Sequence, residues 1–131
     1  MFEQLKGKRV LVTGGAGFIG SHIVDKLVAV GARVSVVDNL VTGKRENLAH
    51  HGDKITFIEN NFFDDAVLEE VLSGIELISH QAALRSVPKS VERPFDYHEV
   101  NVTGTLRLFM KAREKGVKRV VFASSSSLVR S

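Results

Sequence analysis

A glycine-rich turn between a short apolar strand and a helix is the feature that most constrains how this chain can fold. The strand residues Arg9–Thr13 run directly into four glycines, after which helical periodicity begins: Gly14, Gly15, Gly17 and Gly20. Such a turn brings backbone close to a pyrophosphate with no Cβ in the way, and the helix N-terminus offers its N–H groups and positive dipole end to the phosphates. The segment therefore predicts a βαβ unit that binds a dinucleotide.

Short apolar runs alternate with longer stretches of helical period along the rest of the chain, which favours a parallel sheet covered by helices. The predicted strands are mostly β-branched or Leu and short enough to be buried on both faces: Arg9–Thr13, Arg33–Val37, Ile55–Glu59, Ile75–His80 and Arg119–Ala123. We therefore expect an α/β fold, a Rossmann doubly wound parallel sheet of five strands in the order 3-2-1-4-5, with residues 1–131 forming one domain.

The intervening segments predict helices with identifiable ends. Phe18–Val30 stops at Gly31, Glu46–His51 forms at most a short helix, and Asp64 or Asp65 caps a helix that closes at Ser73-Gly74. The longest helix should span Phe95–Lys115, between Pro94 and Gly116. Its expected buried face consists of Val102, Leu106, Phe109 and Met110.

Asp38 ends the second strand region, about 20 residues beyond the glycines. A carboxylate there can accept hydrogen bonds from the hydroxyls of the adenosine ribose. It would also repel the 2′-phosphate of NADP, which needs a cation instead. The sequence therefore predicts NAD as the cofactor and the domain as an NAD-binding domain.

Composition and charge exclude several other classes. The chain has no cysteine, so it holds neither disulfides nor a thiolate metal site. Its first residues are charged where a signal peptide is apolar, and no run approaches the roughly 20 apolar residues of a membrane span, so we expect a cytoplasmic protein with no membrane partner. The net charge of +3 comes mainly from a basic cluster in the second half, read as a solvated helix face with no nucleic-acid partner: Arg107, Lys111, Arg113, Lys115, Lys118 and Arg119.

His50 and His51 lie in a polar loop with no carboxylate or further histidine at ligand spacing in the sequence. Surface positions explain them more simply than metal coordination does. We therefore predict no metal site.

Five motifs in this order resemble the extended short-chain dehydrogenase/reductase family: TGGAGFIGSH, DNLVTGKRENL, HQAALRSVPKSVERP, NVTGT and VVFASSSS. Within the family they look most like the UDP-hexose 4-epimerases, enzymes that oxidise the sugar transiently at C4. The form Ser86-Val87-Pro88 is similar to that of epimerases acting on UDP-N-acetylhexosamines. The resemblance thus implies a UDP-sugar as substrate.

The resemblance also implies cofactor contacts. The pyrophosphate would be held by Gly14, Gly17, Phe18, Ile19 and Gly20, and the ribose would be enclosed by Asp38, Asn39, Thr42 and Gly43. Asn61 and Phe62 match an Asp-Ile pair that contacts the adenine, where Asn keeps an acceptor oxygen but loses the charge. The nicotinamide side would be lined by Ala82, Ala83 and Leu84, with Arg85 at a basic position near the cofactor.

Ser125 and Ser126 fall where the family places the hydroxyl that hydrogen-bonds the reacting oxygen of the sugar. They also follow the fifth strand region, at the edge where open parallel sheets bind ligands. The family's general base is a Tyr with a Lys four residues later, whereas the one tyrosine here, Tyr97, is followed at that spacing by Asn101. We therefore expect a truncated domain without its own general base.

Two alternatives remain open at this stage. A nucleotide-sugar 4,6-dehydratase or decarboxylase would share the same NAD-binding half, and a non-catalytic NAD-binding module would need no further residues. We also expect a homo-oligomer, because the helix over Phe95–Lys115 and the last strand would otherwise leave apolar surface uncovered.

Overall fold

The structure is a computed structural model that describes residues 2–41, 43–82 and 94–122, with side chains over a slightly smaller part. Its strands form one sheet in the order β3-β2-β1-β4-β5, and every neighbouring pair is parallel. The strands are β1 (Arg9–Thr13), β2 (Arg33–Asp38), β3 (Ile55–Glu59), β4 (Leu77–His80) and β5 (Arg119–Phe122). The predicted fold class and strand order are therefore confirmed.

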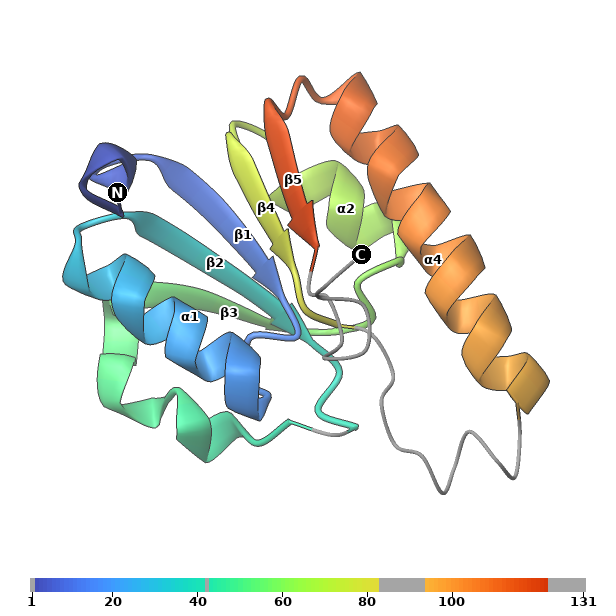
Figure 1. The fold of residues 1–131 in the computed structure, drawn as a ribbon, viewed down its shortest axis with the longest axis horizontal. Coiled ribbons are helices and arrows are strands. Elements are labelled where there is room, and N and C mark those ends of the chain that lie inside the picture. The colour runs from blue at the N-terminus through green and yellow to red at the C-terminus, as the bar shows by residue number, and fades with distance from the viewer. Residues whose placement is uncertain (1, 42, 83–93, 123–131) are drawn as a thin grey trace, which may run out of the picture.

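Helices cover both faces of this sheet (Figure 1). They are α1 (Phe18–Ala29), α2 (Asp65–Val71) and α4 (Pro94–Glu114), with short 3-10 segments η1 (Phe2–Leu5), η2 (Arg45–Asn47) and η3 (Ala49–Lys54). Successive strand residues point to opposite faces. Val10 and Val12 accordingly pack in the core under α1, whereas Leu11 packs in the core under α2 and α4.

Most predicted elements have the expected place, and their ends differ by one or two residues. The short helix expected over Glu46–His51 is instead two 3-10 segments, η2 and η3, and Ala123, expected to end the last strand, lies outside the described residues. Asp64 caps α2 by accepting a hydrogen bond from the Val67 N–H at 3.0 Å. Strand β2 extends one residue further than expected, so that Asp38 itself is a strand residue. Strand β4 begins at Leu77, after a turn in which Ile75 is already buried.

The predicted buried face of α4 was wrong at three of its four positions. Val102, Leu106 and Met110 are 53%, 57% and 58% exposed, whereas Phe109 is half-buried. The helix instead buries Gly104, Leu108 and Ala112, which are also spaced four apart. The reason is close packing: a Cβ on Gly104 would lie 3.0 Å from the ring of Phe62 and 3.1 Å from that of Phe63. The close approach at Gly104 therefore turns the face with Gly104, Leu108 and Ala112 toward the core and leaves Val102, Leu106 and Met110 outside.

Among the helices in the described ranges, none combines the length and apolar character needed to cross a membrane.

Candidate functional site

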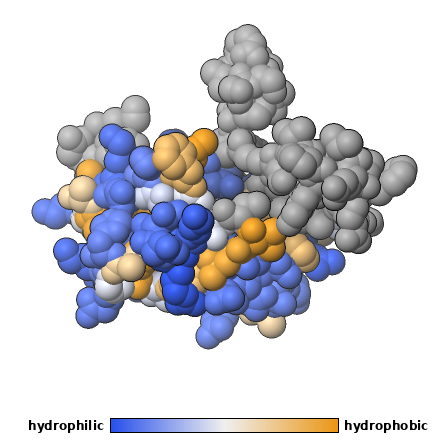
Figure 2. Space-filling model, turned by 90° about the horizontal axis from the view of Figure 1, so that it is seen from below, coloured by the Kyte–Doolittle hydropathy of each residue, from blue (hydrophilic) through white to orange (hydrophobic). Residues whose placement is uncertain are grey.

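The carboxyl ends of the parallel strands meet at one edge of the sheet and bring together residues far apart in the sequence (Figure 1). Gly14 follows β1, Asn39 follows β2, Asn61 lies just beyond β3, and Gln81 and Ala82 follow β4. Figure 2 views the molecule from this end and shows a band of hydrophobic side chains among hydrophilic ones. Ligands of open parallel sheets bind at this edge, so it is the candidate site.

Three of the four motif glycines are required by the protein's own packing. Gly14 has a φ of 69°, and a Cβ there would lie 2.7 Å from the carbonyl carbon of Gln81. A Cβ on Gly15 would lie 2.7 Å from Cγ1 of Val36, and one on Gly20 would overlap the carbonyl oxygen of Gly14. Glycine at these positions lets the turn after β1 lie close to Val36 of β2 and to Gln81 after β4. It also lets the first turn of α1 pack directly on Gly14.

Gly17 differs from the other three. Its φ is −77°, and a Cβ there would meet only the carbonyl oxygen of Gly14, at an ordinary 3.4 Å. The fold itself therefore leaves room for a side chain at this position. Gly17 is also the N-cap of α1, with no side-chain cap, and Phe18 and Ile19 beside it are 78% and 54% exposed. Helix geometry leaves the first N–H groups of α1 without partners in the helix, so this place suits a close-approaching anion.

The Asp38 carboxylate links the glycine turn to the end of β2. It is 7% exposed; its Oδ2 accepts the Ala16 N–H at 2.9 Å and its Oδ1 accepts the Leu40 N–H at 2.7 Å. Each carboxylate oxygen has two lone pairs, so these bonds leave acceptor capacity for a ribose hydroxyl. Sequence reasoning assigned Asp38 a ligand role and missed this structural one.

The segment after Asp38 is attached to the same turn through Ala16. The Ala16 carbonyl oxygen accepts the Lys44 N–H at 3.0 Å and the side-chain amide of Asn47 at 2.8 Å. A Cβ on Gly43 would lie 2.8 Å from the carbonyl carbon of Ala16, so glycine is needed for this approach. Ala16 and Asn47 were not predicted, because no motif marks a backbone carbonyl that anchors a distant loop.

On the adenine side of the predicted site, Asn39 and Asn61 are brought together. The Asn39 side-chain amide donates to Oδ1 of Asn61 at 2.8 Å, while its own Oδ1 accepts the Val41 N–H at 3.0 Å. Phe62 is only 5% exposed and packs in the core with its ring 4.7 Å from that of His80. Any contact from Phe62 to a nucleotide must therefore come from its backbone.

A buried polar chain fixes the end of β4. Thr13 Oγ1 lies 2.6 Å from Nδ1 of His80 and accepts the Gln81 N–H at 3.0 Å, and Nε2 of His80 lies 3.1 Å from Oγ1 of Thr105. Burial lowers the pKa of His80 from 6.5 to about 4, so the imidazole is neutral at pH 7. A proton on Nε2 fits these contacts, with Thr13 donating to Nδ1. The network connects β1, β4 and α4 immediately before Ala82.

Of the remaining predicted site residues, the structure describes only Ala82, which is half-buried against the core under α2 and α4. The other six lie outside the described residues: Thr42, Ala83, Leu84, Arg85, Ser125 and Ser126.

Comparison with known proteins gives consistent matches. The model of the NAD dependent epimerase/dehydratase family matches residues 10–129. A UDP-glucose 4-epimerase of Klebsiella pneumoniae is 41% identical over 126 residues, covering 92% of this chain and 91% of that protein.

Two solved structures show the same likeness. A UDP-N-acetylglucosamine 4-epimerase from Methanobrevibacter ruminantium is 44% identical with a TM-score of 0.85, and the match covers 94% of this chain and 39% of that one. A dTDP-glucose 4,6-dehydratase from Streptomyces venezuelae, solved with NAD bound, is 40% identical with a TM-score of 0.81, covering 86% of this chain and 38% of that one.

The chain is much shorter than most of these relatives. Seven other UDP-glucose 4-epimerases and putative UDP-glucose 4-epimerases that it matches are covered over only 37% to 39% of their own length.

Proposed function

Because the chain belongs to the NAD-dependent epimerase/dehydratase family, we propose that it is the NAD-binding part of a nucleotide-sugar 4-epimerase. The substrate would be UDP-glucose and UDP-galactose or the corresponding UDP-N-acetylhexosamines. The observation that carries this proposal is the meeting of the open space at Gly17, the N-terminus of α1 and the Asp38 carboxylate at one edge of the sheet.

The chemistry of these groups fits NAD. The turn from Gly14 to Gly17 and the first N–H groups of α1 would hold the pyrophosphate, with a backbone approach that a Cβ at position 17 would obstruct. The remaining acceptor capacity of Asp38 suits the two ribose hydroxyls, and its negative charge disfavours a 2′-phosphate. The Asn39 and Asn61 pair would lie beside the adenine.

The chain's other residues would orient the reacting groups. When bound, NAD would supply the hydride acceptor and donor for C4 of the sugar. The network of Thr13 and His80 would fix the backbone that leads into residues 82–85 on the nicotinamide side. Ser125 and Ser126 would hydrogen-bond the reacting sugar oxygen. This sequence contains no Tyr that is followed four residues later by a Lys. We therefore propose no proton abstraction by this chain alone and expect no turnover from residues 1–131.

Titration with NAD⁺ and NADP⁺ tests the cofactor assignment. We expect NAD⁺ to bind more tightly, and we expect Asp38→Asn to narrow the preference because the amide loses the charge that opposes a 2′-phosphate. Calorimetry measures both affinities. Asp53→Asn is the matched control, because Asp53 is an exposed carboxylate outside the predicted site. Equal affinities in the unchanged protein would contradict the NAD assignment.

The 4,6-dehydratase activity is the second candidate, favoured by the likeness to the Streptomyces venezuelae enzyme. Mass spectrometry separates the two reactions in any preparation that converts a nucleotide sugar. Dehydration removes the mass of one water from the substrate, whereas epimerisation leaves the mass unchanged.

A further inference from the structure

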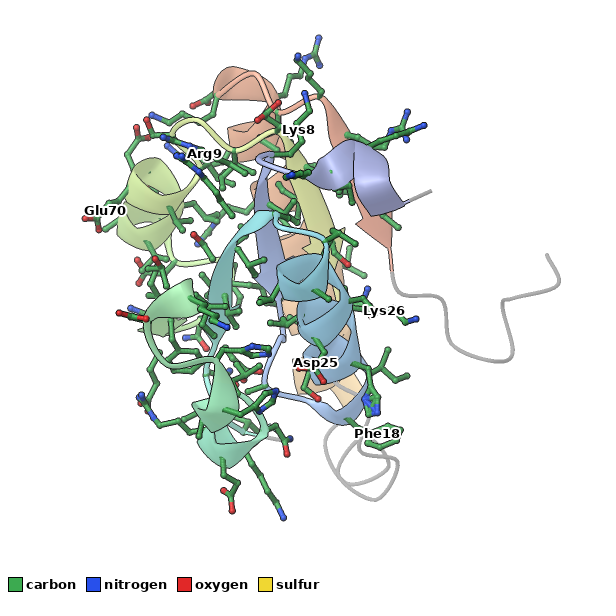
Figure 3. All side chains as sticks on the ribbon, turned by 90° about the vertical axis from the view of Figure 1, so that its left-hand side faces the viewer. Lys8, Arg9, Phe18, Asp25, Lys26 and Glu70 are labelled. Atoms are coloured by element: carbon green, nitrogen blue, oxygen red, sulfur yellow. The ribbon has the colours of Figure 1, made fainter. Side chains whose placement is uncertain are left out.

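Two imidazoles and one carboxylate converge at a place that contains none of the predicted cofactor contacts. Asp25 lies on α1, and His50 and His51 lie on η3. Nε2 of His50 is 2.9 Å and Nε2 of His51 is 2.7 Å from the same atom, Oδ1 of Asp25. Figure 3 shows Asp25 on the side of α1 that is turned toward the η3 segment, with Lys26 pointing away. The sequence alone does not predict this carboxylate, because Asp25 precedes β2 in the chain whereas the two histidines follow it.

The convergence of neighbouring histidines is not what their secondary structure favours. Successive side chains of a 3-10 helix point roughly 120° apart, since the helix has three residues per turn. Here the two rings lie with their centroids 4.0 Å apart, and the three possible ligand atoms all lie within 4.8 Å of one another. Both rings are therefore turned toward one point.

Burial divides the cluster into a fixed part and an adjustable part. The side chain of His51 is 7% exposed, so the expectation of a surface residue was wrong for it, whereas those of His50 and Asp25 are 59% and 46% exposed. A buried imidazole provides a rigid first ligand. The two exposed ligands can shift by the few tenths of an ångström that a bound ion requires, and they leave one side open to water.

The donor set suits a transition-metal ion. Two imidazole nitrogens and one carboxylate oxygen are ligands that Zn²⁺ accepts, with a water in the fourth position. Bonds of about 2.0–2.1 Å in a tetrahedron place neighbouring ligand atoms about 3.3 Å apart. The present nitrogen-to-oxygen distances of 2.9 and 2.7 Å are shorter by about 0.4 and 0.6 Å, so the Asp25 carboxylate would move away from both imidazoles when an ion binds. The alternative is a plain hydrogen-bonded contact in which both imidazoles donate to one oxygen.

We propose that Asp25, His50 and His51 form a binding site for Zn²⁺, and that the bound ion clips η3 to α1. Such a clip would stabilise the segment that carries Lys44 and Asn47, both of which bond to the Ala16 carbonyl of the glycine turn. The proposal does not depend on the proposed function, since it requires neither a nucleotide nor a sugar.

Calorimetric titration of the tag-free, chelator-treated chain with ZnCl₂ at pH 7.5 tests the site. We expect one equivalent of Zn²⁺ to bind and to raise the melting temperature, because a ligand that binds only the folded state stabilises it. His50→Ala and Asp25→Asn should each weaken binding at least about tenfold, since loss of even an indirect partner of a metal ligand costs 10- to 100-fold. Both residues are exposed, so neither change should prevent folding.

His22→Ala is the matched control, because His22 is an exposed histidine of α1 outside the cluster. It should bind Zn²⁺ as the unchanged chain does. Absence of Zn²⁺ binding by the folded, unchanged chain would overturn the proposal and leave the hydrogen-bonded contact. Binding that survives both His50→Ala and Asp25→Asn, or that His22→Ala weakens equally, would also overturn it.

Discussion

Gly17 and Gly20 illustrate how neighbouring residues of one motif can be needed for different reasons. A Cβ on Gly20 would overlap the backbone of Gly14, whereas a Cβ on Gly17 would make one ordinary contact. The fold explains the glycine at position 20 and does not explain the one at position 17. The proposed approach of a ligand phosphate to the N-terminus of α1 would explain it.

This contrast gives a prediction for the pair Gly17→Ala and Gly20→Ala. Gly17→Ala should change the free energy of unfolding by less than about 1 kcal/mol, since the room exists and only the N-cap preference changes. It should nevertheless abolish measurable binding of NAD⁺. Gly20→Ala should destabilise the fold by about 1–3 kcal/mol or more, because backbone atoms must move. Urea unfolding and NAD⁺ titration measure the two effects, and equal loss of stability in both variants would contradict the distinction.

His80 makes stability depend on pH. Its pKa falls from 6.5 to about 4 on burial, so between these values the unfolded chain binds more protons than the folded one. Above pH 6.5 the imidazole is neutral in both the folded and the unfolded chain, so His80 does not reduce the free energy of unfolding. As the pH falls toward 4, that free energy decreases by up to about 3 kcal/mol. Urea unfolding from pH 7.5 to 4.5 should show this loss, and His80→Gln should flatten it. The exposed His22→Gln should keep the slope of the unchanged chain; a slope unaffected by His80→Gln would refute the assignment.

At the scale of elements, helix α4 shows how far sequence periodicity determines a structure. Its position, length and ends could be predicted because Pro94, Gly116 and the apolar spacing mark them locally. Its buried face could not, because two apolar stripes spaced four apart compete along the helix. The contact with Phe62 and Phe63 selects the one that contains Gly104. Hydrophobic periodicity does not show where a helix packs so closely on its neighbours that only a small residue fits, because that depends on tertiary packing.

The same limit applies to the candidate site. The residues that follow each strand could be predicted, because topology alone places strand ends at one edge. The attachment of Lys44 and Asn47 to Ala16 could not, since it depends on the path of a loop and on a backbone carbonyl. Asp25 was missed for a similar reason, as only the packing of α1 brings it to the histidines.

The choice of buried face can be checked with Leu108→Ala and Leu106→Ala. Leu108 is fully buried, so its truncation should destabilise the fold by about 2–5 kcal/mol. Leu106 is 57% exposed on the same helix, so the same change should cost less than about 1 kcal/mol. Thermal or urea unfolding at low micromolar concentration measures both. If Leu106→Ala lowered the free energy of unfolding more than Leu108→Ala did, the face predicted from the sequence would be the buried one.

At the scale of the whole molecule, exposed apolar residues occur on α4 and on β5. Val102, Leu106 and Met110 form an exposed stripe on α4, and Val121 of β5 is 46% exposed. Strand β5 pairs with β4 on one side, and within the described residues no strand pairs with its other side. Exposed apolar stripes and strand edges favour association with another chain.

We therefore expect the chain to self-associate through the stripe on α4 or the open edge of β5. The opposing effect is charge, because Lys118 and Arg119 are exposed at the start of β5 and repel their copies in a partner. We expect the apolar contact to prevail at physiological salt, where exposed charges more than about 8 Å apart are largely screened. Sedimentation velocity across the micromolar range should show mass increasing with concentration. Leu106→Gln should reduce this association, whereas Arg113→Gln, which places the same side chain at an exposed position already polar, should not. A monomer at every concentration would refute self-association and leave the NAD assignment unaffected.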